Sequence, residues 1–256
     1  MYVEELEPFI DEGFIEEVIR PVKSGKEADV YLCAAAGTTG EKLVGAKVYR
    51  SVHQRGFKND SLYREGTHAE LNARTRRAVA KKTSHGKDVL FGTWIRHELE
   101  TLEILHGAGA RVPRPIRSAD RALLMTWIGD EDGAAPHLRQ VRPDPVDAQR
   151  WFRTLVQQVA LFLANNRVHA DLSEYNILVW DGEPAVIDFP QAVDPRFNRN
   201  ALDLLNRDLE NLGRYFGRLG VESDPHRLAG EMWSRWLHSD LLPADLRGVG
   251  EVGWVE

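Results

Sequence analysis

The sequence predicts an α+β fold of two lobes, a small β-rich N-terminal lobe and a helical C-terminal lobe. Three observations predict it. Residues 14–49 are rich in the β-branched and aromatic residues typical of strands, and two amphipathic helical patterns follow later in the chain. A segment rich in glycine and acidic residues, 129–133, separates the β-rich part from the helical part. A chain of 256 residues is long enough for one large domain or two small lobes. We therefore expect a helical extension over 1–13, an N-terminal lobe over 14–128 and a C-terminal lobe over 129–256.

The N-terminal lobe is expected to be built on a β-hairpin. Its expected elements are a short helix with Leu6, Phe9 and Ile10 on one stripe, a strand at 15–19, a loop at 21–27, a strand at 29–33, a turn at 37–40 and a strand at 43–49. A glycine-containing turn between two β-rich segments is typical of a hairpin. Further along, apolar residues at helical spacing predict a helix over 94–106, and an apolar run predicts a buried strand over 122–128.

The C-terminal lobe is expected to be mainly helical. One apolar face predicts a helix over 147–166, and a second leucine-rich stripe predicts another over 200–219. The chain between them holds a short hairpin of apolar strands that ends near Asp188.

Composition excludes some classes of protein. The 33 basic and 39 acidic residues give a net charge of −6, which argues against a general nucleic-acid coat. The single cysteine, Cys33, cannot form an intrachain disulfide, and no apolar run is long enough to span a bilayer, so we expect a cytoplasmic protein without membrane contact. Residues 72–87 nevertheless carry a charge of +6, which fits either a flexible solvated loop, extending over 72–92, or a contact to RNA or nucleotide phosphate.

The strongest chemical pattern is Asp171 and Asn176 in D-x-x-x-x-N spacing, followed by Asp188 at the end of an apolar strand. Phosphoryl transfer needs one carboxylate to accept the proton of an attacking hydroxyl, and a second carboxylate with an amide to hold Mg²⁺ on the triphosphate. Each residue alone could be a turn or cap residue. In this order and spacing the three match the catalytic loop and metal aspartate of protein kinases.

Upstream residues agree with this pattern. Lys47 lies in the apolar strand Val-Gly-Ala-Lys-Val, where an ammonium can pair with the α- and β-phosphates. Glu98 on the 94–106 helix is the candidate counter-charge, and Glu100 and Glu103 on the same helix are alternatives that only geometry can separate from it. The loop with Ser24, Gly25 and Lys26 would cover the phosphates, with its backbone amides, Ser24 and Lys26 facing the nucleotide. With a single glycine it matches G-x-G-x-x-G poorly and a Walker loop not at all, and taken alone it would be a turn.

The segments Ser-Gly-Lys-Glu-Ala-Asp-Val-Tyr (24–31), His-Ala-Asp-Leu-Ser-Glu-Tyr-Asn-Ile-Leu (169–178) and Ile-Asp-Phe-Pro-Gln (187–191) closely resemble the RIO family of atypical serine/threonine protein kinases. The catalytic-loop segment resembles the type-one branch, whereas Asp-Phe-Pro-Gln is more similar to the type-two branch. The resemblance covers about residues 10–220.

The resemblance implies a bilobal protein-kinase-like fold with a reduced helical C-lobe and with ATP and Mg²⁺ (Mn²⁺ as a substitute) in the cleft. It implies that Met125 guards the back of the adenine pocket and that Thr126 and Ile128 offer backbone groups to adenine. Asp171 would be the catalytic aspartate, Asn176 and Asp188 the metal ligands, and Asp188 also a site of transient phosphorylation. Only 68 residues follow Asp188, and no Ala-Pro-Glu motif is among them, so the mode of peptide binding stays open.

Three functions remain open on the sequence. The first is a serine/threonine protein kinase that also phosphorylates itself. The second is an ATPase that acts as an assembly factor on a ribosomal or other RNA particle, held through the basic loop 72–87. The third is a small-molecule kinase of the aminoglycoside or choline type, which 68 residues after Asp188 can hardly accommodate.

Overall fold

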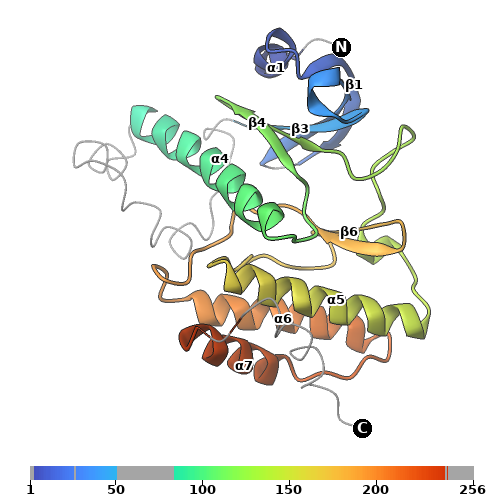
Figure 1. Ribbon diagram of the computed structural model, residues 1–256, viewed down its shortest axis with the longest axis vertical. Helices are drawn as coiled ribbons and strands as arrows, with labels where there is room; N and C mark the ends of the chain where they lie inside the picture. The colour runs from blue at the N-terminus through green and yellow to red at the C-terminus, as the bar shows by residue number, and fades with distance from the viewer. Residues whose placement is uncertain (1–2, 26, 51–83, 240, 242–256) are drawn as a thin grey trace. The chain divides into compact units, whose positions relative to one another are not determined.

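The computed structural model describes residues 3–25, 27–50, 84–239 and 241. Contacts divide the described chain into two compact units, the first with the residues up to 103 and 113–135, and the second with 104–112 and those from 136 onward. The first is built on a β-sheet and the second is mainly helical (Figure 1). The predicted α+β class and the order of the two lobes are confirmed.

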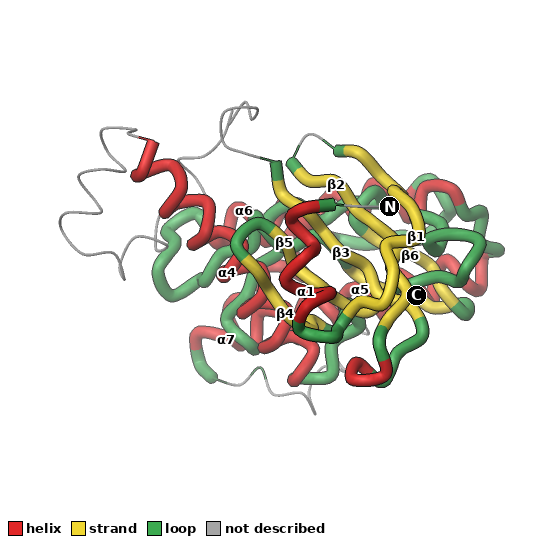
Figure 2. The backbone as a smooth tube through the Cα atoms, turned by 90° about the horizontal axis from the view of Figure 1, so that it is seen from above, coloured by secondary structure: helices red, strands yellow, loops and turns green. Residues whose placement is uncertain are grey.

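The first unit contains a five-stranded sheet of order β1-β2-β3-β5-β4, in which every pair is antiparallel. Figure 2 shows its strands in yellow. Its strands are β1 (Ile15–Ser24), β2 (Ala28–Ala35), β3 (Leu43–Tyr49), β4 (Pro115–Ala119) and β5 (Ala122–Thr126). The predicted hairpin is β2 with β3, and the turn that joins them contains the short helix η2 (Gly37–Thr39) and a left-handed Gly40. The left-handed conformation explains why a glycine ends this turn.

The loop predicted at 21–27 is wrong over its first half, because β1 continues to Ser24. Proline is rare inside strands, but β1 lies at the edge of the sheet, where a residue without an N–H group is tolerated. A register irregularity between Pro21 and Lys23 accommodates the proline.

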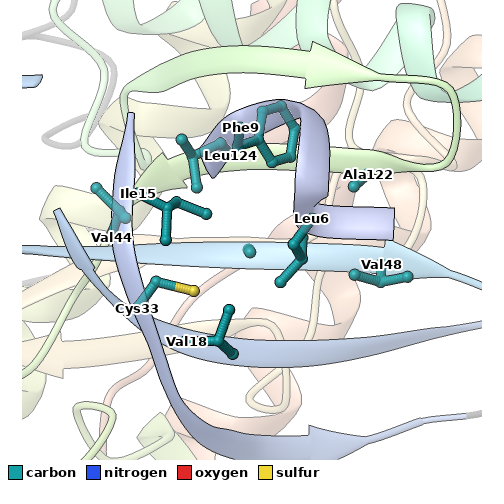
Figure 3. Packing of buried hydrophobic residues seen from close by; sticks show 10 residues of the cluster. Leu6, Phe9, Ile15, Val18, Cys33, Val44, Val48, Ala122 and Leu124 are labelled. Carbon is teal, nitrogen blue, oxygen red and sulfur yellow. The ribbon is translucent and has the colours of Figure 1, made fainter. Parts of the chain in front are cut away.

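The core of the first unit lies on the face of the sheet that the N-terminal helices cover. These helices are η1 (Glu4–Leu6) and α1 (Glu7–Asp11), and they place Leu6 and Phe9 against Ile15, Val44 and other apolar side chains of the sheet (Figure 3). Cys33 is fully buried in this cluster. Ile10, predicted on the same stripe, is 39% exposed, because only residues three apart, Leu6 and Phe9, face the sheet.

Helix α4 (Ser84–Gly107) begins ten residues before the predicted start at 94. The predicted flexible loop over 72–92 is therefore wrong for 84–92, and residues 72–83 lie outside the described residues. The apolar spacing used for the prediction begins only at Ile95, so it does not extend to the first turns of this helix.

The second unit packs three helices together: α5 (Pro145–Ala164), α6 (Ala201–Gly217) and α7 (Pro225–Leu237) lie side by side (Figure 1). Asp144 caps α5 by accepting a hydrogen bond from the amide of Asp147 (2.8 Å), so this helix begins before the predicted residue 147. The predicted apolar faces of α5 and α6 meet, for example at Phe152 and Phe216, whose ring centroids are 5.4 Å apart.

Two short elements position the chemistry of this unit. The hairpin β6 (Ile177–Trp180) with β7 (Glu183–Val186) follows the predicted catalytic loop, and the short helix η4 (Leu138–Gln140) lies beside β6. No helix in the described ranges is long and apolar enough to cross a membrane.

The segment after β5 closes a small loop on itself. Gly129 pairs with Ala134, and the amide of Ala135 donates to the carbonyl oxygen of Ile128 (2.9 Å). Residues 129–135 therefore group with the first unit, whereas the sequence places the lobe boundary after Ile128.

Candidate active site

The first unit contains the predicted ion pair. Lys47 on β3 and Glu98 on α4 are 9% and 1% exposed, and the ammonium Nζ lies 2.7 Å from Oε1 and 3.1 Å from Oε2 of the carboxylate. Side chains alternate along β3, so Ala46 and Val48 enter the core cluster while Lys47 leaves from the opposite face. A buried ammonium needs such a counter-charge, and the pairing predicted from the sequence is confirmed.

Geometry also separates Glu98 from the other acids of its helix. Glu98 lies at helical spacing from buried Ile95 and Leu102, so it is on the packed face of α4. Glu100 and Glu103 are exposed. The sequence alone could not choose among these three carboxylates.

The predicted phosphate loop is the tip of the β1–β2 hairpin. The hydroxyl of Ser24 donates to Asp29 Oδ1 (2.7 Å) and accepts from the guanidinium of Arg50 (2.5 Å), and the amide of Gly25 donates to the carbonyl oxygen of Ala28 (2.9 Å). The Ser24 hydroxyl and the Gly25 amide are thus both used within the hairpin, and the acceptor for Ser24 is Asp29, a role that the motif did not reveal. Lys26 lies outside the described residues.

Arg50 is a residue that the sequence analysis missed. Its guanidinium donates to both carboxylate oxygens of Asp29 (2.7 and 3.1 Å), and its amide donates to the carbonyl oxygen of Glu27 (2.9 Å). Hydrogen bonds from Arg50 are the largest influence on the pKa of the Asp29 carboxyl, which lies below its usual value. Arg50 therefore ties the hairpin to the end of β3.

The residues predicted to face adenine lie at the end of β5. Met125 is half-buried and pairs with Gly45 of β3. The amide of Thr126 donates to the carbonyl oxygen of Arg114 (2.9 Å), so that N–H group is not available to a ligand. The carbonyl oxygen of Ile128 accepts from Ala135, whereas the Ile128 amide donates to no other described residue.

Trp127 explains the glycine in Val-Gly-Ala-Lys. A Cβ atom built on Gly45 would lie 3.3 Å from Cε3 of the indole ring, and the indole N–H donates to the carbonyl oxygen of Asp130 (3.0 Å). The ring therefore covers the strand beside Gly45, a contact that sequence spacing does not signal.

The second unit contains the predicted catalytic loop. The side-chain amide of Asn176 donates to the carbonyl oxygen of Asp171 (2.9 Å) and approaches its carboxylate Oδ2 (3.4 Å), so the loop closes on itself. Asp188 follows β7 with a left-handed backbone (φ 73°), and the amide of Ile187 donates to the Asn176 carbonyl oxygen (2.9 Å). The structure therefore brings Asp171, Asn176 and Asp188 together.

Asp171 is an exposed residue with a perturbed acidity. Loss of hydration, followed by repulsion from the carboxylate of Asp188, raises the pKa of Asp171, while Arg207 and the Asn176 amide oppose the shift. The two carboxylates are thus close enough to influence each other.

A buried carboxylate on α6 holds the loop, and the sequence analysis missed it. Asp208 is 1% exposed and accepts hydrogen bonds from the amides of Ala170 (2.7 Å) and Leu172 (2.9 Å), the two neighbours of Asp171. Arg207 donates to the carbonyl oxygen of Ala170, which has a left-handed backbone (φ 66°). The sequence did offer one signal for this residue, because Asp208 is an acidic residue on the apolar stripe of α6, where charged side chains are rare unless they are paired.

His169 braces the same loop. It is 2% exposed, its ring lies 4.6 Å from that of Phe189, and Nδ1 accepts from the amide of Asp171 (3.3 Å). The other ring nitrogen lies 3.2 Å from the carbonyl oxygen of Ile187. These contacts support a structural role for His169 in holding the loop.

The donor set fits Mg²⁺. The ion prefers carboxylate and amide oxygens, which Asp188 and Asn176 carry. Since the Asn176 side chain donates through its nitrogen, its oxygen Oδ1 stays available, and no described residue donates to it. The mutual repulsion of Asp171 and Asp188 is what a cation would relieve.

Comparison with known proteins gives the family. The family model described as "RIO domain" matches residues 29–228, more than half of the chain. The chain belongs to the RIO family. A RIO protein of Haloferax volcanii, named RIO-type serine/threonine-protein kinase Rio1, is 32% identical over 84% of this chain and 68% of its own length. The RIO-type kinase Rio1 of Thermoplasma acidophilum is 30% identical over 74% of this chain and 93% of its own.

Other RIO relatives are longer. The chain spans 37% of the Caenorhabditis elegans serine/threonine-protein kinase RIO1, to which it is 31% identical over 78% of its own length. Among solved structures, it is similar to the Rio2 kinase of Chaetomium thermophilum, crystallised as an ADP/Mg²⁺-phosphoaspartate complex, with a TM-score of 0.62 at 21% identity over 97% of this chain and 75% of that chain. This likeness confirms the predicted kinase-like RIO fold.

Proposed function

We propose that this chain is an ATP- and Mg²⁺-dependent serine/threonine protein kinase, which transfers the γ-phosphoryl group of ATP to protein hydroxyls, including its own. One observation supports it above the others: Asp171 and Asn176 are joined by a hydrogen bond, and Asp188 lies close enough to raise the pKa of Asp171. These are the base, amide and second carboxylate that phosphoryl transfer requires.

Asp171 is the proposed base. Its exposed carboxylate can accept a hydrogen bond from a substrate hydroxyl and take the proton as oxygen attacks the γ-phosphorus. Its raised pKa makes it a better proton acceptor than an ordinary aspartate. The bonds from Asp208 to the amides on both sides fix its backbone before a substrate arrives.

Asn176 and Asp188 would hold Mg²⁺, with Mn²⁺ as a proposed substitute. When bound, the ion neutralises charge on the phosphate oxygens. The amide contributes an oxygen without a second negative charge, while its nitrogen keeps the loop closed on Asp171.

In the first unit, Lys47 is the proposed partner of the α- and β-phosphates, held in place by Glu98. The unengaged amide of Ile128 is the proposed donor to adenine, and the side chain of Met125 the proposed wall behind it. A phosphate contact by Ser24 or Gly25 would require the hairpin bonds described above to exchange for bonds to the nucleotide.

Incubation with γ-labelled ATP and Mg²⁺ tests the proposal. We expect acid-stable label on serine or threonine of the chain, absent in Asp171→Asn and Asp188→Asn. Asp181→Asn is the matched control, because Asp181 is an exposed residue of the β6–β7 turn with a left-handed backbone (φ 50°) that asparagine tolerates. Nucleotide binding without any acid-stable label would overturn the kinase assignment.

A second candidate is an ATPase that passes through a phosphoaspartate at Asp188. It is favoured by the exposure of Asp171, because water can reach this carboxylate and accept the phosphoryl group in place of a protein hydroxyl. A carboxylate oxygen of Asp188 would displace ADP from the γ-phosphorus, and water would then release phosphate. Label that hydroxylamine removes, and that Asp188→Asn lacks, would support it.

The proposed setting of either activity is the cytoplasm. A ribosomal or RNA particle is the proposed partner of the basic segment 72–87, whose first twelve residues lie outside the described ones. Co-sedimentation with such a particle, weakened when Arg74, Arg76 and Arg77 are neutralised, tests this part.

A further inference from the structure

An arginine and a tyrosine form an exposed pair beside the catalytic loop. Tyr175 precedes Asn176 and is 54% exposed, and the guanidinium carbon of Arg139 lies 4.9 Å from the centre of its ring. Arg139 is also exposed. An arginine above an aromatic ring has its planar face covered, while its N–H groups stay directed outward along the edge.

The backbone that carries Arg139 is firmly held. Leu138 is fully buried, and its carbonyl oxygen accepts a hydrogen bond from the hydroxyl of Tyr215 on α6 (2.8 Å). The side chain of Gln140 accepts from the amide of His137 (2.9 Å) and closes a capping box around η4. Arg139 therefore projects from a short helix that is fixed on both sides.

The same helix is attached to the catalytic loop. The amide of Arg139 approaches the carbonyl oxygen of Glu174 (3.4 Å), and the next residue is Tyr175. Tyr175 is followed by Asn176, whose side chain binds Asp171, so a single residue links the arginine pair to Asp171.

The charge of Arg139 is not neutralised within the described part of the chain. No described carboxylate lies within ion-pair distance of its guanidinium, and the nearby Glu174 instead faces Arg218 (3.4 Å). Exposed arginines elsewhere in this unit, such as Arg150 and Arg227, do have carboxylate partners. Arg139 is thus a pre-oriented cation with its hydrogen-bonding edge available.

We propose that Arg139, with Tyr175 as its platform, is a specificity-determining residue that binds an acidic side chain of the protein substrate close to the phosphorylated hydroxyl. The inference rests on the proposed kinase function. A guanidinium can bind a carboxylate through two parallel hydrogen bonds, and the contact with the Tyr175 ring restricts where the guanidinium of Arg139 can lie. The tyrosine ring adds apolar contact to the peptide chain.

A positional peptide library tests the inference. Each peptide carries one central serine and either aspartate or asparagine at one flanking position, and each rate is divided by the rate of ATP hydrolysis of the same enzyme. We expect one position at which aspartate is favoured about five- to tenfold. Arg139→Gln should remove this preference, and Arg139→Glu should replace it with a preference for lysine at the same position.

Arg153→Gln is the matched control, because Arg153 is an exposed arginine on another element, α5, where its guanidinium lies 3.5 Å from the side-chain oxygen of Gln149. It should keep the aspartate preference. A charge reversal that inverts the preference cannot come from a general loss of structure, so it separates recognition from stability.

The outcomes are distinguishable from failure of the kinase proposal. If neither peptides nor the chain itself acquire acid-stable label, the proposed function fails first, and this inference with it. If the chain phosphorylates itself but the peptides of the library are not labelled, or are labelled without a preference for aspartate, the inference alone is overturned. The same holds if Arg139→Gln weakens binding of a labelled single-stranded RNA and leaves the peptide preference unchanged.

Discussion

Replacement of Asp208 by asparagine tests how the catalytic loop is held. The carboxylate is 1% exposed and accepts two backbone hydrogen bonds, and its burial raises its pKa from 3.8 to about 7. Asparagine has the same shape and cannot titrate. It keeps one acceptor oxygen and turns an N–H₂ group toward the second amide, which costs about 1–3 kcal/mol at any pH.

The pH dependence gives the sharper test. Because the folded protein binds the Asp208 proton more tightly than the unfolded chain, the stabilisation from this group is complete below pH 3.8 and is lost as the pH rises to about 7. Each pH unit in this window corresponds to about 1.4 kcal/mol. Between pH 5 and pH 8 the wild type should therefore lose about 3 kcal/mol of unfolding free energy that Asp208→Asn does not lose.

Urea unfolding followed by tryptophan fluorescence at pH 5, 6, 7 and 8 measures this difference. Asp203→Asn, at an exposed position of the same helix, is the control and should follow the wild type. If the free-energy difference between the wild type and Asp208→Asn stays constant over this range, Asp208 is charged throughout, and the two amide bonds outweigh its burial.

Three further predictions concern the first unit. Lys47→Met should abolish phosphoryl transfer and reduce the free energy of unfolding by about 3–5 kcal/mol, because it leaves the Glu98 carboxylate buried without its cation. Adding Glu98→Leu should restore part of the stability, measured by urea titration, but none of the activity. Losses of stability that simply add in the double variant would contradict this prediction. Cys33 is fully buried with its pKa raised to about 12, so a thiol reagent at pH 8 should label it only after unfolding; rapid labelling of the native chain would show that the core opens. Gly45→Val should displace the Trp127 ring and weaken ATP binding, which indole fluorescence can measure. It should also reduce the free energy of unfolding by about 1–3 kcal/mol. An unchanged affinity for ATP would mean that the ring is not part of the nucleotide site.

The sequence predicted the elements that bury a regular apolar pattern. Helices α5 and α6 and strand β3 were found because their stripes or runs are continuous. The first turns of α4 lack such a stripe, and the proline in β1 reads as a break unless the strand is known to be at an edge.

The same distinction applies to the candidate site. Lys47, Asp171, Asn176 and Asp188 could be selected because motif spacing identifies residues whose chemistry is set by their own side chains. Supporting residues such as Asp208 could not, because their role depends on which backbone groups the fold brings to them. Ser24 was selected from the motif as a residue of the phosphate loop, but the fold gives its hydroxyl another partner, the carboxylate of Asp29.

The N-terminal helices have a consequence for dissecting this protein. The family match begins at residue 29, in β2, yet Leu6 and Phe9 are fully buried against the sheet and β1 forms its edge. A fragment cut where the similarity begins would leave one side of the sheet bare and remove an outer strand. We therefore expect the smallest fragment that folds by itself to be longer than the stretch matched by the family model, and to include η1, α1 and β1.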